Sequence, residues 1–181
     1  MKKLYTGKYI RILHSYTIVI KLTNLFKQRL TPLLAVPKIK HFCSYQERSH
    51  YEVKEKLYAL GLNKVEVETL ISQLIEEDYL NEQRFAEHFV GGKFRQKHWG
   101  KIKIKYELNQ KRVSEYNIKK ALALIPINDY KNTLLKLATT KWNSLKKEQY
   151  MNREVKTTNY LLQKGYEHNF IKEAIQQLKE K

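Results

Sequence analysis

Apolar residues recur at one spacing in three stretches of the chain. In each stretch, apolar positions follow a leucine at offsets of 5, 10, 14 and 17 residues, with one tyrosine among them. Steps of four and then three residues keep side chains on one face of an α-helix. The pattern predicts three tandem copies of a helical unit of about 45–50 residues, which would present a long surface. The sets are Leu57, Leu62, Val67, Ile71 and Leu74; Leu108, Val113, Ile118, Leu122 and Ile125; and Leu161, Tyr166, Ile171, Ile175 and Leu178.

The expected fold class is therefore all-α, with three tandem three-helix repeats. We place the repeat modules at residues 31–79, 80–127 and 128–181. Residues 1–30 fit none of the modules. We expect them to form an N-terminal extension that is disordered or absent from the native protein.

Capping residues set the helix limits predicted for the first module. Its first helix begins at Pro32, because proline suits the first helical position, or at Pro37 if that second proline disturbs the helix. Its second helix ends at Gly61, a favourable residue just past a helix end. Asn63 and Glu66 have the spacing of a capping box at the start of the third helix.

The second module contains two stretches whose local sequence is ambiguous. Gly91 and Gly92 are expected to loosen or end its first helix. Residues 101–105, KIKIK, alternate like a half-buried strand when they are taken alone. However, Ile104 falls at the position of a core valine in the first copy. We therefore predict a helix from residue 99 or 100 to residue 110.

Charge is the next feature that separates the modules. The chain has 35 Lys and Arg against 18 Asp and Glu, a net charge of +17. Residues 93–120 alone hold ten basic and two acidic residues. Such an excess favours a polyanionic partner, most simply nucleic acid. The alternative is a lysine-rich surface that serves only solubility.

The basic stretch of the second module supplies the candidate contact residues. Basic side chains can neutralise phosphates while an aromatic ring stacks on an unpaired base. Phe94 and Trp99 are the candidates for stacking. Alternatively both rings belong to the core, which we favour for Trp99, and the lysines form a solvated face. The candidates for nucleic-acid or filament contact are Lys93, Arg95, Lys97, Lys101, Lys103, Lys105, Lys111 and Arg112.

Other classes of function find little support. The single cysteine, Cys43, excludes an internal disulfide and favours a reducing compartment. The six histidines are scattered, and no HExxH, CxxC or phosphate-loop motif occurs, so we expect no catalytic site, metal site or cofactor. Residues 10–25 are fairly apolar but are interrupted by Arg11, His14 and Lys21. We therefore expect neither a membrane span nor a secretory signal.

Three short motifs stand out within the modules: EDYLNEQRFA at residues 77–86, CSYQER at 43–48 and LLQKGY at 161–166. The first resembles the signature between the first and second repeats of the RecX family, and the other two resemble parts of its first and third repeats. The resemblance covers about residues 31–180. Residues 1–30 and the pair Gly91-Gly92 depart from the family pattern. In the second module the resemblance continues through Lys93-Phe94-Arg95, Trp99-Gly100, Lys103-Ile104, Leu108 and Ile118.

This resemblance implies a cytoplasmic bacterial regulator of the RecA recombinase in recombination and DNA repair. It implies an elongated, curved array that binds along the groove of the RecA–DNA filament and limits filament growth, ATP hydrolysis and strand exchange. The expected partners are the RecA filament and single-stranded DNA, with double-stranded DNA as a second candidate. The protein is expected to be a monomer, not an enzyme and not bound to a membrane. The alternative is a helical-repeat nucleic-acid-binding protein that acts without RecA.

Overall fold

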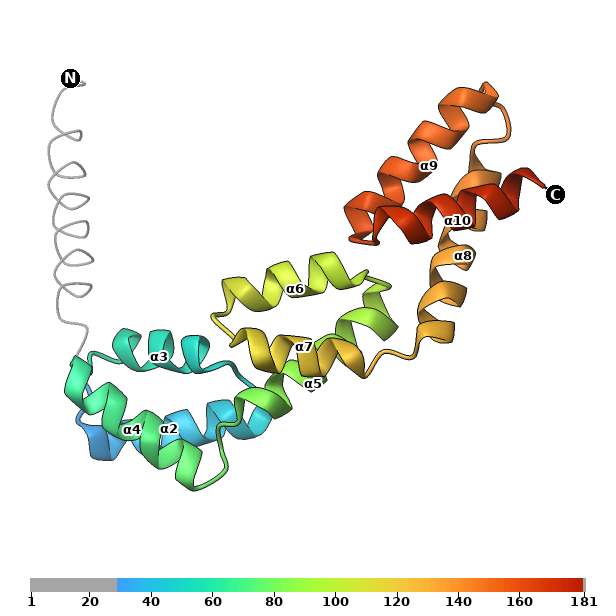
Figure 1. The fold of residues 1–181 in the computed structure, drawn as a ribbon. Coiled ribbons are helices and arrows are strands. Elements are labelled where there is room, and N and C mark those ends of the chain that lie inside the picture. The colour runs from blue at the N-terminus through green and yellow to red at the C-terminus, as the bar shows by residue number, and fades with distance from the viewer. Residues whose placement is uncertain (1–28, 181) are drawn as a thin grey trace, which may run out of the picture.

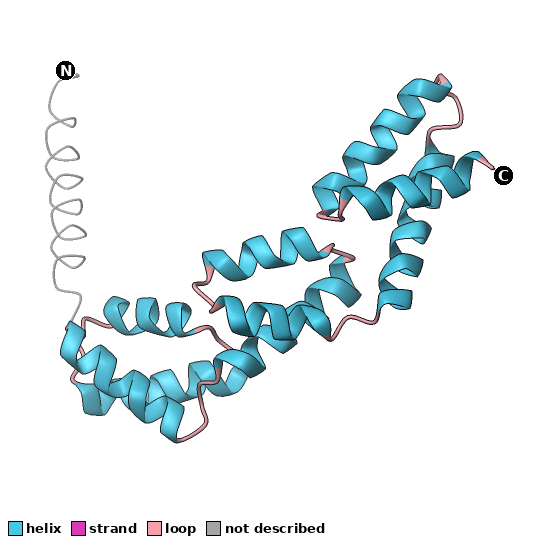
Figure 2. Cartoon of the chain, viewed as in Figure 1, coloured by secondary structure: helices cyan, strands magenta, loops and turns pink. Residues whose placement is uncertain are grey.

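The computed structural model describes residues 29–180 of the chain, and every element in this range is a helix (Figure 2). The helices follow one another in three groups of three, which we call modules 1, 2 and 3. They form an elongated, curved array, so the predicted fold class is confirmed (Figure 1). Module 1 comprises α2 (Pro32–Tyr45), α3 (His50–Ala59) and α4 (Lys64–Glu76); module 2 comprises α5 (Glu82–Lys97), α6 (Lys101–Gln110) and α7 (Glu115–Ala123); module 3 comprises α8 (Ile127–Ser144), α9 (Tyr150–Lys164) and α10 (His168–Lys179).

The predictions for the start of the chain lie almost entirely outside the described residues. This applies to residues 1–28 of the expected extension and to the apolar stretch 10–25. Of the remaining two residues, Leu30 donates its backbone N–H to the carbonyl of Leu60 at 3.0 Å. The module limits at 79/80 and 127/128 stay predictions.

The repeated apolar positions form the core. Thirteen of the fifteen are buried, and Leu122 and Leu178 are half-buried and pack against the same core. The buried residues fall into two clusters. One belongs to module 1, whereas the other is shared by all six helices of modules 2 and 3. Modules 2 and 3 are therefore joined by apolar packing that module 1 does not share.

The helices of module 1 begin where the capping residues predict, and the structure decides between the two predicted starts of the first helix. Helix α2 starts at Pro32 and continues through Pro37, so the alternative start at Pro37 is wrong. The hydrogen bond that Pro37 cannot donate would end on the carbonyl of Leu33, in the exposed first turn where water can replace it. Both predicted capping interactions at Asn63 and Glu66 are present in α4.

The two ambiguous stretches of module 2 are both helical. Helix α5 runs unbroken through Gly91 and Gly92, so the expected interruption there is wrong. The buried side chains of Val90 and Phe94, four residues apart, hold this segment against the core. Their packing outweighs the weak helix propensity of glycine, about 1 kcal/mol per residue. The KIKIK stretch lies in α6, where Ile104 is fully buried, as predicted.

Candidate nucleic-acid interface

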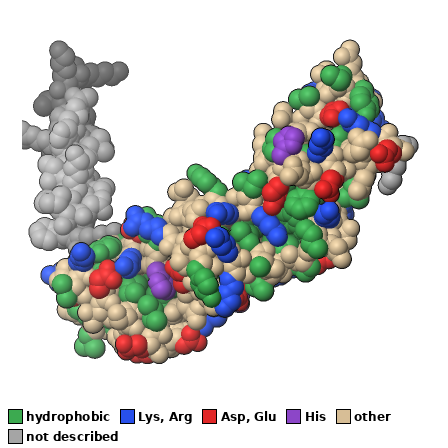
Figure 3. Space-filling model, viewed as in Figure 1, with side chains coloured by type: hydrophobic (Ala, Val, Ile, Leu, Met, Phe, Trp, Pro, Cys, Tyr) green, Lys and Arg blue, Asp and Glu red, His purple; other side chains and the backbone are tan. Residues whose placement is uncertain are grey.

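The eight candidate contact residues lie on the last two turns of α5, on α6 and in the turn that follows it. Lys and Arg side chains, with Asp and Glu among them, occupy the middle part of the face seen in Figure 3. The structure does not bring all eight together. It divides them among one ordered row, one ion pair and several separate positions.

The ordered row alternates lysines with aromatic rings. The ammonium groups of Lys103 and Lys93 lie 4.7 and 5.1 Å from the ring centre of Trp99. Lys93 also lies 5.1 Å from the ring of Phe89, and Lys111 lies 5.8 Å from that same ring. We call these five residues the basic row. A cation over an aromatic face gains about 0.5–1 kcal/mol at an exposed site, which limits the movement of these lysines.

Two lysines of the row have no carboxylate partner within residues 29–180, because neither Lys93 nor Lys103 forms an ion pair there. Lys103 instead donates to the backbone carbonyl of Gln163 at 3.3 Å. Lys111 is different, because its ammonium lies 2.7 Å from Glu52 of module 1. Burial acts to raise the pKa of the Glu52 carboxyl, but hydrogen bonds from Lys111 and Ser49 outweigh it and hold that pKa below its usual range.

The remaining basic candidates lie apart from the row. Lys105 pairs with Glu115 of α7 at 2.6 Å. The Arg95 side chain lines a separate groove with Asp129, at the start of α8. The Lys101 ammonium lies 5.2 Å from the buried ring of Tyr130, Arg112 lies over Tyr51 of module 1, and Lys97 is exposed.

The two aromatic candidates differ in exposure. Phe94 is only 9% exposed and its ring lies 6.0 Å from that of Tyr130 in the shared core. This burial argues against base stacking by Phe94, and we remove it from the proposed interface. Trp99 is half-buried and packs against the same core, with the two lysines over its ring. A base would have to displace at least one of them to stack there.

A polar cleft separates modules 1 and 2 next to the row. Its volume is about 540 Å³, and Lys93 and Lys111 line it together with Glu47, Glu52 and Glu107. The modules meet across it through charged groups and not through a shared core. We call this contact the module 1–2 joint.

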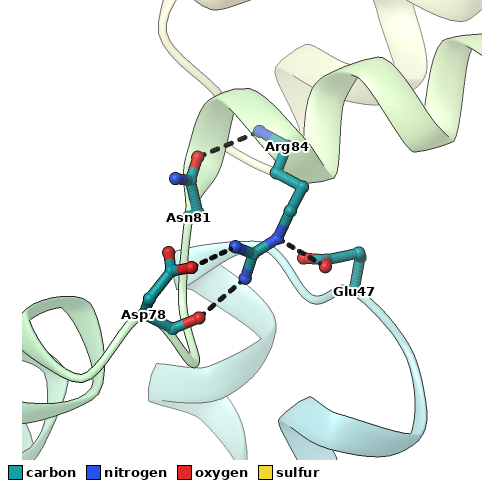
Figure 4. Close-up of polar contacts among 4 residues, drawn as sticks. All are labelled: Glu47, Asp78, Asn81 and Arg84. Carbon is teal, nitrogen blue, oxygen red and sulfur yellow. Dashed lines mark hydrogen bonds and ion pairs between the residues drawn. The ribbon is translucent and has the colours of Figure 1, made fainter.

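Arg84 of α5 organises the module 1–2 joint (Figure 4). Its Nε donates to Glu47 at 2.6 Å, and its two terminal nitrogens donate to the side chain and backbone carbonyl of Asp78, both at 2.8 Å. The backbone N–H of Arg84 donates to the side-chain oxygen of Asn81, which caps the helix. Three of these four residues come from the EDYLNEQRFA motif, and Glu47 comes from the CSYQER motif. The two motifs therefore meet at this joint.

Modules 2 and 3 meet end to end, with the last turn of α9 against the first turn of α6. The backbone N–H of Gly100 donates to the carbonyl of Lys164 at 2.8 Å, and that of Ile102 donates to the carbonyl of Gly165 at 3.0 Å. A Cβ built on Gly100 would lie 2.1 Å from the Gly165 oxygen. The Trp99-Gly100 and LLQKGY motifs thus form the module 2–3 joint, and no side chain fits at Gly100.

Buried hydroxyl groups complete the module 2–3 joint. The Tyr130 hydroxyl accepts from the N–H of Lys101 at 2.9 Å and donates to Glu167 at 2.5 Å. Tyr166 donates to the carbonyl of His98 at 3.2 Å. Burial raises the pKa of both tyrosines far above their usual range, and Glu167 adds to the rise at Tyr130. Both phenols therefore stay protonated and keep these donors in place.

Sequence reasoning missed several residues of this region. Phe89 is not among the predicted contact residues, although its half-exposed ring links two lysines of the row. Lys164 donates to the carbonyl of Lys97 at 3.4 Å, which brings a further basic residue from module 3 to this surface. The four-residue step from Phe89 to Lys93 would have placed them on one helix face. The approach of Lys164, 67 residues away along the chain, depends on the tertiary fold.

The described part of the chain shows neither a metal-binding cluster nor a membrane-spanning helix. No cluster of three or more His, Cys, Asp or Glu residues within it could hold a metal ion. None of its helices is both long enough and apolar enough to cross a membrane.

Two family models match successive parts of the chain. Residues 81–122 match the model described as "RecX, second three-helix domain". Residues 128–175 match the model described as "RecX, third three-helix domain".

Individual proteins similar to this chain are also regulatory proteins named RecX. The chain is 29% identical to the regulatory protein RecX of Oceanobacillus iheyensis over 87% of this chain and 58% of that protein. It is 30% identical to that of Chlorobium phaeobacteroides over 74% of this chain and 85% of that protein. The chain spans 58% and 62% of the lengths of two curated relatives, those from O. iheyensis and Clostridium perfringens.

Two solved structures have a similar fold. The crystal structure of RecX from Lactobacillus salivarius superposes with a TM-score of 0.75 and 26% identity, and the match covers 82% of this chain and 96% of that one. A second crystal structure of a regulatory protein RecX gives a TM-score of 0.72 at 21% identity, over 78% of this chain and 70% of that one, and supports the fold alone.

Proposed function

Because this chain belongs to the RecX family of regulatory proteins, we propose that it binds RecA–DNA filaments and inhibits RecA. It limits ATP hydrolysis, filament growth and strand exchange by occupying the filament, without catalysing a reaction. In this proposal the protein is cytoplasmic, acts as a monomer and needs no cofactor.

The observation that carries the nucleic-acid part of the proposal is the basic row. Its lysines are held over aromatic rings, and Lys93 and Lys103 form no ion pair within residues 29–180. Such ammonium groups can neutralise phosphates without first leaving a carboxylate. The joints on either side hold the row between two further modules, whose length suits a partner that is itself extended.

RecA hydrolysing ATP on single-stranded DNA provides the test. Added protein should lower the steady-state rate in a saturable manner, and the double variant Lys93→Glu/Lys103→Glu should require at least about tenfold more protein for the same inhibition. The matched control is Lys146→Glu/Lys147→Glu, which reverses two exposed charges between α8 and α9. An unchanged hydrolysis rate at saturating protein would contradict the RecA part of the proposal.

The alternative, a nucleic-acid-binding protein independent of RecA, rests on the same basic row. It predicts DNA binding without any effect on hydrolysis by preformed filaments. Loss of DNA binding in the double variant, together with unchanged RecA activity in the wild type, would favour this alternative.

A further inference from the structure

Module 3 carries an apolar groove between α9 and α10, with a volume of about 620 Å³. The buried Ile171 and Ile175 of α10 form its floor. Met151, Val155 and Leu162 of α9 form its wall, and they are 73%, 55% and 41% exposed. Their spacing of four and seven residues puts them on one face of α9. Hydrophobic side chains also reach the surface of the module 3 arm in Figure 3.

The corresponding position is bridged by charges in the other two modules. Lys54 pairs with Glu68 across α3 and α4 at 2.8 Å, and Lys105 pairs with Glu115 across α6 and α7 at 2.6 Å. Both lysines stand three residues before the repeated leucine, and module 3 has Thr158 at that position. Without the lysine, no ion pair between described residues crosses the middle of the groove.

Helix α9 is also longer than its counterparts. It has 15 residues, whereas α3 and α6 have ten each. The additional turn at its start carries Met151 and lengthens the apolar wall. The groove is therefore a feature of module 3 and not a general consequence of the repeat.

Charges around the groove indicate what it can receive. Among residues 29–180, Glu154 is the one carboxylate that lines it, and Lys179 neutralises Glu154 at 2.8 Å. Lys172 lines the groove and forms no ion pair within residues 29–180, which leaves an excess of positive charge. Two copies of a chain with net charge +17 repel each other, which disfavours self-association. A nucleic acid would gain little from an isoleucine floor, because phosphate contacts supply most of its affinity.

We propose that the groove between α9 and α10 docks an acidic amphipathic helix of a partner protein. Apolar residues of that helix, at spacing i, i+3, i+4 and i+7, would lie on Ile171 and Ile175, and its acidic flank would face Lys172. The basic row lies on module 2. One molecule can therefore hold a nucleic acid and a protein helix at the same time. This proposal does not depend on RecA or on DNA binding.

A fluorescent synthetic peptide tests the proposal on the full chain. The probe carries leucines at i, i+3, i+4 and i+7 and glutamates elsewhere, and its controls are a scrambled peptide of equal charge and a version with lysines for the glutamates. The acidic amphipathic peptide should bind at least about tenfold more tightly than either control. Val155→Asp should remove that advantage, because it puts a charge on the apolar wall.

The chain supplies a matched control for Val155→Asp. Ile102 stands at the same repeat position in module 2 and is also about half exposed, so Ile102→Asp should leave peptide binding unchanged. Lys172→Glu changes an exposed position and should weaken binding of the acidic peptide but not of the lysine peptide. This variant keeps the test valid if Val155→Asp lowers the helix content.

Three results would overturn the proposal. The first is equal affinity for the amphipathic and scrambled acidic peptides. The second is a wild-type dimer in sedimentation that Val155→Asp converts to a monomer, which would assign the groove to a second copy. The third is displacement of the peptide by a single-stranded oligonucleotide in the wild type and in Lys93→Glu/Lys103→Glu alike, which would assign the groove to nucleic acid.

Discussion

His50 lies close to the contact between modules 1 and 2, where Glu82 of α5 acts on its charge. It begins α3, and its buried Nε2 has no hydrogen-bond partner among residues 29–180. Burial lowers the pKa of His50 below its ordinary 6.5; Glu82 of α5 opposes this shift and Lys54 adds to it. The folded protein therefore favours the neutral imidazole at the module 1–2 joint.

This shift predicts a pH dependence of stability. At neutral pH the neutral form of His50 predominates in both states. As pH falls below 6.5 the unfolded chain binds the proton first, so stability is lost until the lower folded pKa is reached. His50→Gln should therefore reduce the fall in thermal midpoint between about pH 7 and about pH 5.5. The exposed His88→Gln is the control and should keep the wild-type fall; an equal fall in all three proteins would refute the role of His50.

At the scale of elements, the contact between α9 and α6 joins two helix ends of opposite polarity. The last carbonyls of α9 accept from the first N–H groups of α6, so each helix satisfies backbone groups that the other leaves free. The negative end of one helix dipole also meets the positive end of the other. Gly165, at φ +88°, ends α9 so that these carbonyls face Gly100.

Gly100→Ala should open this contact. The added methyl group meets the Gly165 carbonyl, and relieving such a clash costs about 1–3 kcal/mol of unfolding free energy. Gly92→Ala is the matched control, because nothing lies within 4 Å of its added Cβ. That substitution in the middle of α5 should stabilise by about 0.5–1 kcal/mol. Urea unfolding measures both, and a neutral or stabilising Gly100→Ala would contradict the close approach.

On the scale of the whole molecule, two unlike joints connect the three modules. Ion pairs across a polar cleft connect modules 1 and 2, whereas backbone hydrogen bonds, buried tyrosines and a shared core connect modules 2 and 3. The basic row lies between the two joints, and three of its residues, Phe89, Lys93 and Lys111, line the cleft of the first. Its charges add to a net charge of +17, which makes association with any polyanion depend on salt.

The salt dependence of binding to single-stranded DNA gives a count of phosphate contacts. About five contacts would give a slope near −3.5 in log K against log salt, or about 100-fold weaker binding from about 50 to about 200 mM. Lys93→Gln/Lys103→Gln should reduce the steepness of that slope by about 1.4. The control Lys146→Gln/Lys147→Gln should preserve it. Equal slopes for the two double variants would exclude Lys93 and Lys103 as phosphate contacts.

Many residues of the candidate site could be predicted from the sequence, but their arrangement in space could not. The charge pattern located the basic stretch. Of the eight candidate residues, however, five lie outside the ordered row, and a sixth, Lys111, lies in the row but is paired with Glu52. Phe94 is buried because α5 continues past Gly91 and Gly92 and turns that ring toward Tyr130. Only contacts between helices distinguish it from Trp99, since both are aromatic residues within the same basic run.

By itself the sequence determined the all-α class, the repeated core positions and the helical state of KIKIK, because the three copies must bury equivalent faces of equivalent helices. Local capping chemistry likewise determined where α4 begins. Only the tertiary structure decided which lysines pair with carboxylates within residues 29–180, how the motifs meet at the two joints, and that an apolar groove stays open on module 3. Those features depend on distances between residues far apart in the chain, and a repeat spacing carries no information about them.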